Sequence, residues 1–376
     1  MKIVSKIGKV YINLRGFHTN RKIIIFESDD WGSIRMPNSG IYNKLVTKIP
    51  RIKEDRFSKY DSIASVHDLE LLFELLLNFK DKNGNNPIIT ANTIVANPDF
   101  KKIVDNNFEK YEFETFDNTI KKLPDGKKIL SLWSKGINEK IFMPQLHGRE
   151  HLNVPFWLNE IKSGNYDLLE AFNEGCFGIP FSPTISSKRN NVMAALDCLG
   201  LDGEKKFQTR SIIEASKIFE NYFGFKSISF IAPAYIWDSH IEKVLKEVNI
   251  KILQGLPFQY IPNKNNTKYD RKLHYIGEKN KFDQYYITRN AFFEPLASKK
   301  IDSVDLALSK IEYAFKFNKP AIIGTHRINF IGSLIEENRD QNLLNFKLLI
   351  KTILKKWPDV EFLSTDKLIN LLEKKY

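Results

Sequence analysis

The sequence predicts an α/β protein whose strands are mainly parallel. Short runs rich in β-branched and aromatic residues recur along the chain, and longer stretches with helical periodicity separate most of them. This alternation favours parallel βαβ units, arranged either as a barrel or as a doubly wound sheet. No internal repeat of about 20–50 residues is visible, which argues against a solenoid.

Eight segments have the composition of buried strands and are bounded by turn-forming residues. They are residues 22–27, 87–95, 141–147, 227–232, 250–255, 284–290, 321–326 and 360–364. Helical apolar stripes occur at residues 66–81, 209–222, 304–317 and 342–356. Ser65 is a favourable N-cap for the first helix, and Gly224 suits the end of the second. Residues 263–271 are polar and predict a surface loop.

The length and composition are typical of a globular protein, with 376 residues, 42% hydrophobic and 27% charged. We expect a single domain over residues 1–376, with a core at about 20–366 and insertions near residues 40–65 and 155–210. Two cysteines, Cys176 and Cys198, argue against a disulfide scaffold or a cysteine-rich zinc module.

Without a long apolar run or a signal-peptide core, we predict a cytoplasmic protein that lacks a transmembrane helix. Association with a membrane surface is the alternative.

The formal net charge is +12, from 57 Lys and Arg against 45 Asp and Glu. The basic residues are scattered along the chain, whereas a nucleic-acid-binding protein usually concentrates them on one element or face. We therefore expect a solvated lysine-rich surface and no nucleic-acid partner. The dinucleotide-binding, P-loop and nucleophile-elbow motifs are absent from the sequence, so these three kinds of site are unsupported.

An Asp-Asp pair follows the first predicted strand, in the segment Glu27-Ser28-Asp29-Asp30-Trp31. Adjacent carboxylates repel each other unless a cation or a proton separates their charges. One of them can ligate a metal ion while the other acts as a base. A solvated turn in which Asp30 caps a helix is the alternative.

Two histidines, His147 and His151, stand at positions i and i+4 where the predicted strand at residues 141–147 ends. Side chains at this spacing lie on one face of a helical turn, close enough to hold one ion. Two neutral imidazoles and one carboxylate leave coordination positions open for water and substrate.

His326 ends the predicted strand at residues 321–326. Barrel and open-sheet enzymes place working residues at the carboxyl ends of strands. A structural histidine bonded in a loop is the alternative. Because all three segments end predicted strands, we expect them to meet at one edge of the sheet. The remaining histidines show no pattern and are assigned to the surface or to satisfied core positions: His18, His67, His240 and His274.

The order of these segments resembles that of the polysaccharide deacetylases, carbohydrate esterase family 4, which share the chitooligosaccharide-deacetylase homology domain. The family's motifs are an Asp-Asp pair after a strand, a His-x-x-x-His pair and a Leu-x-His-type strand end. They are matched here by Asp29-Asp30, His147 to His151, and Gly324-Thr325-His326. The resemblance covers about residues 20–366 and implies a distorted (β/α) barrel of about seven to eight strands.

The resemblance also implies a metal-dependent hydrolase that removes an N- or O-linked acetyl group from a sugar or a polysaccharide precursor. Asp29 is then the catalytic base and His326 the catalytic acid. The ligands of one divalent ion are Asp30, His147 and His151. Zinc suits this set, and cobalt, nickel, manganese and iron are compatible with it. Aromatic residues beside the motifs are candidates for contact with sugar rings: Trp31, Tyr235 and Trp237.

The family's third motif, Arg-x-Pro followed by an aromatic residue, is incomplete in this chain. Pro233 and Tyr235 are present, but Ile231 stands where arginine is expected. Arg289, at the end of another predicted strand, is the candidate replacement and an expected substrate-binding residue. Two alternative functions stay open: a glycoside hydrolase on a related barrel, with Asp29 and Glu294 as its carboxylates, and an inactive carbohydrate-binding homologue.

Overall fold

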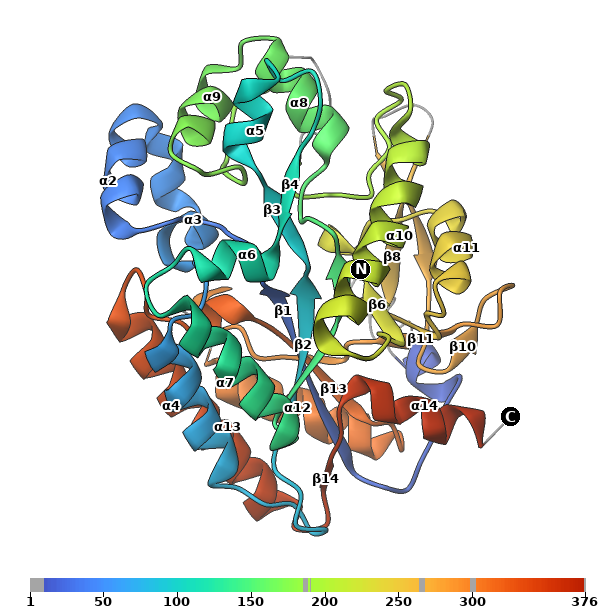
Figure 1. Ribbon diagram of the computed structural model, residues 1–376. Coiled ribbons are helices and arrows are strands. Elements are labelled where there is room, and N and C mark those ends of the chain that lie inside the picture. The colour runs from blue at the N-terminus through green and yellow to red at the C-terminus, as the bar shows by residue number, and fades with distance from the viewer. Residues whose placement is uncertain (1–9, 185–188, 190, 264–267, 298–301, 375–376) are drawn as a thin grey trace.

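A ring of parallel strands forms the centre of the molecule (Figure 1). The computed structural model describes residues 10–184, 189, 191–263, 268–297 and 302–374. In ring order the strands are β1 (Ile23–Trp31), β2 (Ile89–Ile94), β5 (Phe142–Gly148), β6 (Ser229–Ile231), β7 (Ile252–Gly255), β11 (Tyr285–Thr288), β12 (Ala291–Phe292) and β13 (Ala321–His326).

The ring closes at the junction of β11 and β12. β11 pairs with β7 and β12 pairs with β13, both in parallel, and only Arg289 and Asn290 separate the two strands. The Arg289 N–H donates to Gly255 O at 2.9 Å, and the Asn290 N–H donates to Ile322 O at 3.1 Å. With β11 and β12 taken as one bent strand, the ring has seven parallel strands. The predicted fold class, a distorted (β/α) barrel, is therefore confirmed.

Seven of the eight predicted strands belong to this ring. The eighth is β14 (Glu361–Phe362), which lies outside the ring and pairs with the start of β1. The predicted loop at residues 263–271 is wrong in part, because β8 (Phe258–Pro262) and β9 (Tyr269–Leu273) form an antiparallel hairpin; residues 264–267 lie outside the described residues. Three short strands complete the set: β3 (Ala96–Pro98), β4 (Phe113–Thr115) and β10 (Glu278–Lys279).

Helices cover the outside of the ring, with α4, α7 and α13 on the left of Figure 1 and α10 and α11 on the right. All four predicted helices occur, but α10 and α13 begin earlier than predicted because their first turns are polar and extend no apolar stripe. None of the described helices is long and apolar enough to cross a membrane. The bounds are α4 (Val66–Leu77), α6 (Phe116–Lys121), α7 (Gly126–Asn138), α10 (Glu204–Phe223), α11 (Ser239–Glu247), α12 (Ser303–Lys316), α13 (Glu336–Lys356) and α14 (Thr365–Glu373).

The interior of the ring changes from apolar to polar along the strands. In β1, Ile24 and Phe26 pack with the outer core, whereas Ile23 and Ile25 pack inside the ring. Because strand side chains alternate between two faces, the next inward positions after Ile25 are Glu27 and Asp29. The carboxyl ends of the strands therefore carry the polar residues of the barrel.

The two predicted insertions form a second layer at the end of the ring shown uppermost in Figure 1. Their side chains share one hydrophobic cluster, which includes Leu45, Ile52, Trp157, Phe172 and Phe177. The division of the chain into domains stays a prediction. The helices of this layer are α2 (Ser39–Lys48), η1 (Pro50–Glu54), α3 (Arg56–Tyr60), α5 (Phe100–Asp105), α8 (Val154–Lys162) and α9 (Tyr166–Asn173).

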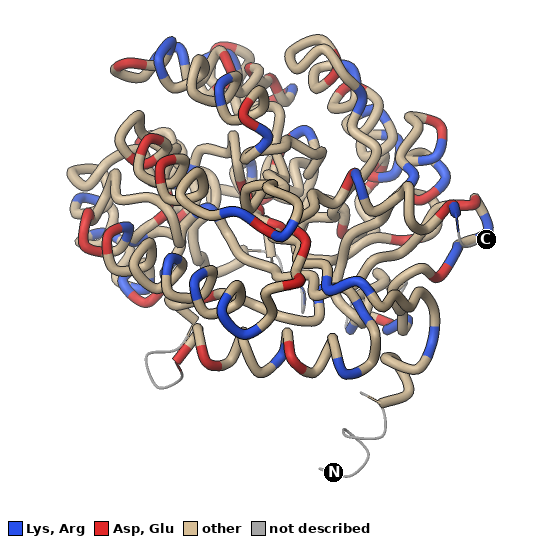
Figure 2. The backbone as a smooth tube through the Cα atoms, turned by 90° about the horizontal axis from the view of Figure 1, so that it is seen from below, with Lys and Arg blue, Asp and Glu red and all other residues tan. Residues whose placement is uncertain are grey.

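Basic and acidic residues are interspersed on the face shown in Figure 2. Lys and Arg alternate with Asp and Glu along the helices, as the scattered charges of the sequence predict. The absence of a nucleic-acid partner stays a prediction.

Candidate metal and catalytic centre

A bulge at the end of β1 turns both aspartates towards one cavity. β1 runs through Trp31, so the Asp-Asp pair is part of the strand. In a regular strand, neighbouring side chains point to opposite faces. Asp30, however, has a φ of 74°, and the pairing of β1 with β2 shifts register between Ser28 and Trp31. Asp29 and Asp30 consequently line the same cavity.

Trp31 points away from this cavity, so its predicted contact with substrate is wrong. Its side chain is 1% exposed, and its Nε1–H donates to Ser28 Oγ at 2.9 Å. Its ring packs edge-on against Trp133 and Phe142 in the outer core. Trp237 is likewise buried, and its Nε1–H donates to Glu242 Oε1 at 3.1 Å.

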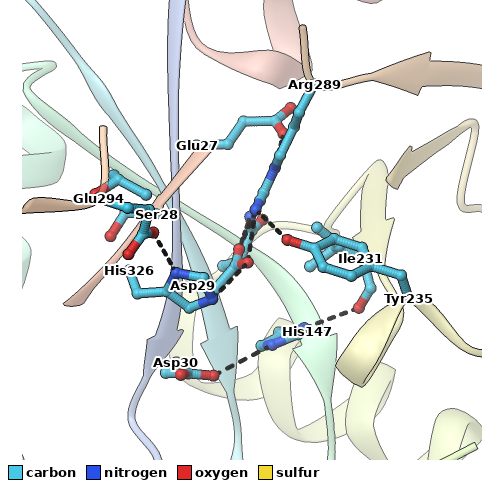
Figure 3. Close-up of polar contacts among 12 residues, drawn as sticks. Glu27, Ser28, Asp29, Asp30, His147, Ile231, Tyr235, Arg289, Glu294 and His326 are labelled. Carbon is cyan, nitrogen blue, oxygen red and sulfur yellow. Dashed lines mark hydrogen bonds and ion pairs between the residues drawn. The ribbon is translucent and has the colours of Figure 1, made fainter. Parts of the chain in front are cut away.

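Asp30, His147 and His151 converge at the mouth of the ring. One ligand atom from each residue lies within 4.8 Å of the others. Asp30 Oδ1 is 3.5 Å from His147 Nε2 and 3.4 Å from His151 Nε2. His147 Nδ1 is 2.9 Å from Ile231 O, which orients the ring and directs Nε2 towards Asp30 (Figure 3). Burial lowers the pKa of His151 to about 3, so its imidazole is neutral, as a metal ligand must be.

Several buried polar atoms of this cluster have no hydrogen-bond partner among the described residues: Asp30 Oδ1, His147 Nε2 and His151 Nδ1. Buried polar atoms are almost always paired, and such a group of exceptions requires an explanation. A divalent cation bound between one carboxylate and two imidazoles satisfies Asp30 Oδ1 and one nitrogen of each ring, and this donor set is one that zinc accepts. The residues present therefore fit a metal ion.

Arg35 occupies the second oxygen of the Asp30 carboxylate. Its Nη2–H donates to Asp30 Oδ2 at 3.2 Å, which leaves Oδ1 facing the histidines. Although burial opposes ionisation, the Arg35 guanidinium holds the pKa of Asp30 well below its ordinary value. Arg35 Nε also lies 3.5 Å from Asp61 Oδ2, and Arg327 donates two hydrogen bonds to the other oxygen of Asp61.

Arg289 crosses the ring and holds Asp29 with both of its terminal nitrogens (Figure 3). Nη1 and Nη2 each lie 2.7 Å from one oxygen of Asp29, and Nε donates to Glu27 Oε2 at 2.8 Å. Although burial opposes ionisation, this guanidinium holds the pKa of Asp29 below its ordinary value. Arg289 thus lies beside Asp29, as expected of the residue predicted to replace the arginine missing at Ile231. Its predicted contact with substrate is wrong, because its side chain is fully buried between two carboxylates.

A glycine makes room for this arginine. A Cβ on Gly324 would lie 2.6 Å from Arg289 Cδ, closer than real atoms approach. Position 324 lies two residues before His326, on the face of β13 that points into the ring. It must be glycine because any side chain there would occupy the space of Arg289. Tyr235 contacts the arginine from the other side, since its hydroxyl accepts from Arg289 Nη1 at 3.0 Å. Ala234 and Tyr235 both have positive φ angles, 56° and 59°, a strained backbone of the kind found at functional sites.

His326 faces Asp29 across the cavity, with its Nε2 at 3.8 Å from Asp29 Oδ2. Its Nδ1 bonds to Glu294 Oε1. Burial opposes protonation, but the Glu294 carboxylate raises the pKa of His326 to about 9. At neutral pH the Asp29 carboxylate is therefore ionised and the His326 imidazole is protonated.

The centre opens into a cavity of about 510 Å³. The ring contributes both aspartates, the three histidines and Tyr235. The insertions contribute the remaining wall, which is largely apolar: Phe57, Ile179, Pro180, Phe181, Val192 and Met193.

Sequence reasoning missed several residues that contact the centre. Glu27 had a signal, because it stands two positions before Asp29 and shares its face. Asn92, whose Nδ2–H donates to Asp29 Oδ1 at 2.8 Å, is an amide residue inside a predicted buried strand, which is also a signal. Glu294 was named as a glycosidase carboxylate and not as the partner of His326. Arg35 precedes the first insertion and Asp61 lies in it, and neither residue follows a pattern in the sequence.

Comparisons with known proteins give structural similarities at low sequence identity. No protein-family model matches the chain, and no curated protein matches its sequence. A protein named as a polysaccharide deacetylase from Pseudomonas aeruginosa PAO1 has a TM-score of 0.48 and 8% identity, covering 95% of this chain and 93% of that one. A similarly named protein from Mycobacterium smegmatis has a TM-score of 0.45 and 10% identity, with coverages of 96% and 93%.

A pseudoenzyme of carbohydrate esterase family 4 from Bacillus anthracis has a TM-score of 0.37 and 9% identity, covering 93% of this chain and 66% of that one. Because all three similarities are this low, the roles of the site residues are inferred from the geometry of this chain alone. The solved structures that resemble the chain thus include polysaccharide deacetylases and members of carbohydrate esterase family 4, all at low sequence identity.

Proposed function

We propose that this chain is a metal-dependent hydrolase that removes an acetyl group, N- or O-linked, from a sugar or a polysaccharide precursor. The observation that carries the proposal is the convergence of Asp30, His147 and His151, in which Asp30 Oδ1 and His147 Nε2 are buried without a hydrogen-bond partner among the described residues. A second carboxylate and a protonated imidazole lie next to them. A divalent cation at this position supplies Lewis-acid polarisation of a carbonyl and lowers the pKa of water. Zinc is the ion that we expect there.

Asp29 and His326 are suited to opposite proton transfers. The Asp29 carboxylate is ionised and can accept a proton from water, which is the role of a general base. The His326 imidazolium can donate a proton to the departing amine or alkoxide. Their separation of 3.8 Å puts both groups within reach of one carbonyl group in the cavity.

Three neighbours position this pair. Arg289 fixes both oxygens of Asp29, and Glu294 fixes the His326 ring through Nδ1. Burial raises the pKa of Tyr235, so its phenol keeps its proton. Because the Tyr235 oxygen accepts from Arg289, the O–H hydrogen is directed elsewhere and can bond to a ligand in the cavity.

The other two functions have less support from the contacts. A glycosidase needs one carboxylic acid and one carboxylate on either side of a glycosidic bond. Asp29 is bound by Arg289, and the Glu294 carboxylate accepts from His326 and Asn329. An inactive homologue was suggested by the arginine missing at Ile231, but Arg289 occupies the equivalent contact with Asp29.

The proposal is tested by measuring the metal content of the purified protein and acetate release from a panel of N- and O-acetylated sugars. We expect about one divalent ion per chain and acetate release that stops on chelation and returns when zinc is added. Appearance of reducing ends without acetate would indicate a glycosidase instead. A protein that binds no divalent ion would contradict the proposal.

A further inference from the structure

Arg35 presents one free edge of a buried guanidinium to the cavity. Its side chain is 6% exposed, and it follows β1 directly, before the first insertion. Nη2 is bonded to Asp30, and Nε faces Asp61. Nη1 has no hydrogen-bond partner among the described residues, although Arg35 lines the cavity. Nη1 lies near Gly178, at 3.3 Å from the point that a Cβ there would take.

The carboxylates around Arg35 have other partners. Asp61 Oδ1 accepts from Arg327 Nε at 3.0 Å and from Arg327 Nη2 at 2.9 Å. Asp30 directs Oδ1 towards the histidines and is the carboxylate that we expect on the metal ion. A divalent cation held by one carboxylate and two neutral imidazoles keeps a net positive charge, to which Arg35 adds another.

The other carboxylates of the cavity wall already have partners, and both oxygens of Asp29 are held by Arg289. Asp55 also lines the cavity, but its Oδ2 accepts from the backbone N–H and the hydroxyl of Ser58, at 2.8 and 2.6 Å. The described residues of the second insertion that line the cavity carry no charged side chain. A ligand in the cavity therefore meets excess positive charge at its metal end.

We propose that Arg35 binds an anionic group of the ligand, so that the substrate carries a carboxylate or a phosphate near its acetylated atom. This inference rests on the proposed function, because it takes the cation as bound. A hydrogen bond from a guanidinium to an oxyanion is charge-assisted and is strengthened where water is excluded. A neutral ligand that displaced water from Nη1 would leave a buried donor unpaired. The free-energy cost of that unpaired donor makes the site select anionic ligands over neutral ones.

Calorimetric binding of matched ligand pairs tests this inference without turnover. The carboxylate pair is N-acetylglycine and its neutral counterpart N-acetylglycinamide. The phosphate pair is N-acetyl-O-phosphoethanolamine and N-acetylethanolamine. Because zinc itself attracts anions, the decisive quantity is the change in anion preference between the zinc-loaded wild-type protein and zinc-loaded Arg35→Gln. We expect that change to be about ten- to a hundredfold for one of the two pairs, which identifies the anion.

Two further variants make the result specific. Arg51→Gln removes the same charge from the first insertion, but Arg51 pairs with Asp167 and does not line the cavity, so the anion preference of this variant should equal that of the wild type. Arg35→Lys keeps the positive charge but lacks the planar set of guanidinium donors, so it should lose part of the anion preference. This variant also provides the test if Arg35→Gln does not fold. An anion preference unchanged in the Arg35 variants, or no binding of either anion by the wild type, overturns the inference.

The outcome is separable from that of the proposed function. A protein that holds zinc and releases acetate, but shows no Arg35-dependent anion preference, contradicts the role of Arg35 alone. A protein that shows the preference but releases no acetate from any ligand contradicts the proposed function alone.

Discussion

Arg289 Nη1 and Nη2 each lie 2.7 Å from an oxygen of Asp29, although the two residues are 260 positions apart in the chain. The contact exists because the strand that closes the ring switches neighbours at Arg289, which points this side chain across the barrel mouth. The same guanidinium also bonds Glu27, so one positive charge pairs with two buried carboxylates.

Removing this arginine should destabilise the fold strongly. Arg289→Met leaves Glu27 and Asp29 buried without their common partner, and breaking a buried ion pair in this way costs about 3–5 kcal/mol. Urea unfolding measures the loss. Arg21→Met is the matched control, because Arg21 also forks onto one carboxylate, Glu361, but is 42% exposed. That change should cost about 1 kcal/mol or less, and equal losses in the two variants would contradict the prediction.

Asp29→Asn should abolish the base without removing the metal ion. Asparagine keeps the size of the side chain but cannot take a proton from water, so acetate release should fall by about 10²–10⁴-fold. The variant should retain the metal content of the wild type, measured by elemental analysis. Full activity with native metal content would remove Asp29 from the proton transfers.

His147→Ala should lose the metal ion itself. The residue is one of the three proposed ligands, and its Nε2 has no hydrogen-bond partner among the described residues. We expect the variant to hold less than about a tenth of the wild-type metal after dialysis. His240→Ala is the control, since that histidine bonds Thr209 on the outer helices and should leave the metal content unchanged. Stoichiometric metal in His147→Ala would contradict the proposed ligand set.

The part of the site that could be predicted from the sequence is the part that depends on strand ends. Asp30, His147 and His326 each end an apolar run, and parallel strands bring their carboxyl ends to one edge. The orientation of Trp31 could not be predicted, because it depends on a bulge that no local pattern marks. The contact of Arg35 with Asp61 depends on how an insertion folds over the ring, which local periodicity does not encode.

Long-range pairing limits prediction in the fold as well. Apolar runs located all seven strands of the ring, since each strand is buried on both faces. The run at residues 360–364 has the same composition, yet β14 stays outside the ring because both neighbours of β1 are already present as β2 and β13. Composition identifies a strand but not its place in the sheet.

The protonation of His326 should depend on Glu294. Burial opposes the charge, but Glu294 raises the pKa of His326 from an ordinary value near 6.5 to about 9. Its protonation therefore stabilises the fold fully below about pH 6.5, and this stabilisation is lost as the pH rises through about 9. An NMR titration of the metal-free protein should find the midpoint near 9, and Glu294→Gln should move it down. A cation bound beside Asp30 should also lower it, through repulsion between like charges.

The control for this titration is Glu278→Gln. It removes a carboxylate that lies 3.0 Å from the Nδ1 of another histidine, His274, and should leave the His326 midpoint in place. In the loaded enzyme, acetate release should decline on the alkaline side as His326 loses its proton. A His326 midpoint that is the same with and without Glu294 would contradict the assignment.

Gly324→Ala tests whether the crossing of Arg289 needs an open strand. The added Cβ would stand 2.6 Å from Arg289 Cδ, so the guanidinium must shift away from Asp29. A misplaced positioning group typically costs about a hundredfold in rate. We expect a loss of that order in acetate release, with the metal content retained because no ligand of the ion moves. Gly255→Ala, at the end of β7, is the control, because its Cβ would meet only the Trp237 ring, at 3.4 Å. Wild-type activity in Gly324→Ala, as in the control, would contradict the prediction. It would mean that the reaction does not need the hydrogen bonds from Arg289 to Asp29 in their present geometry.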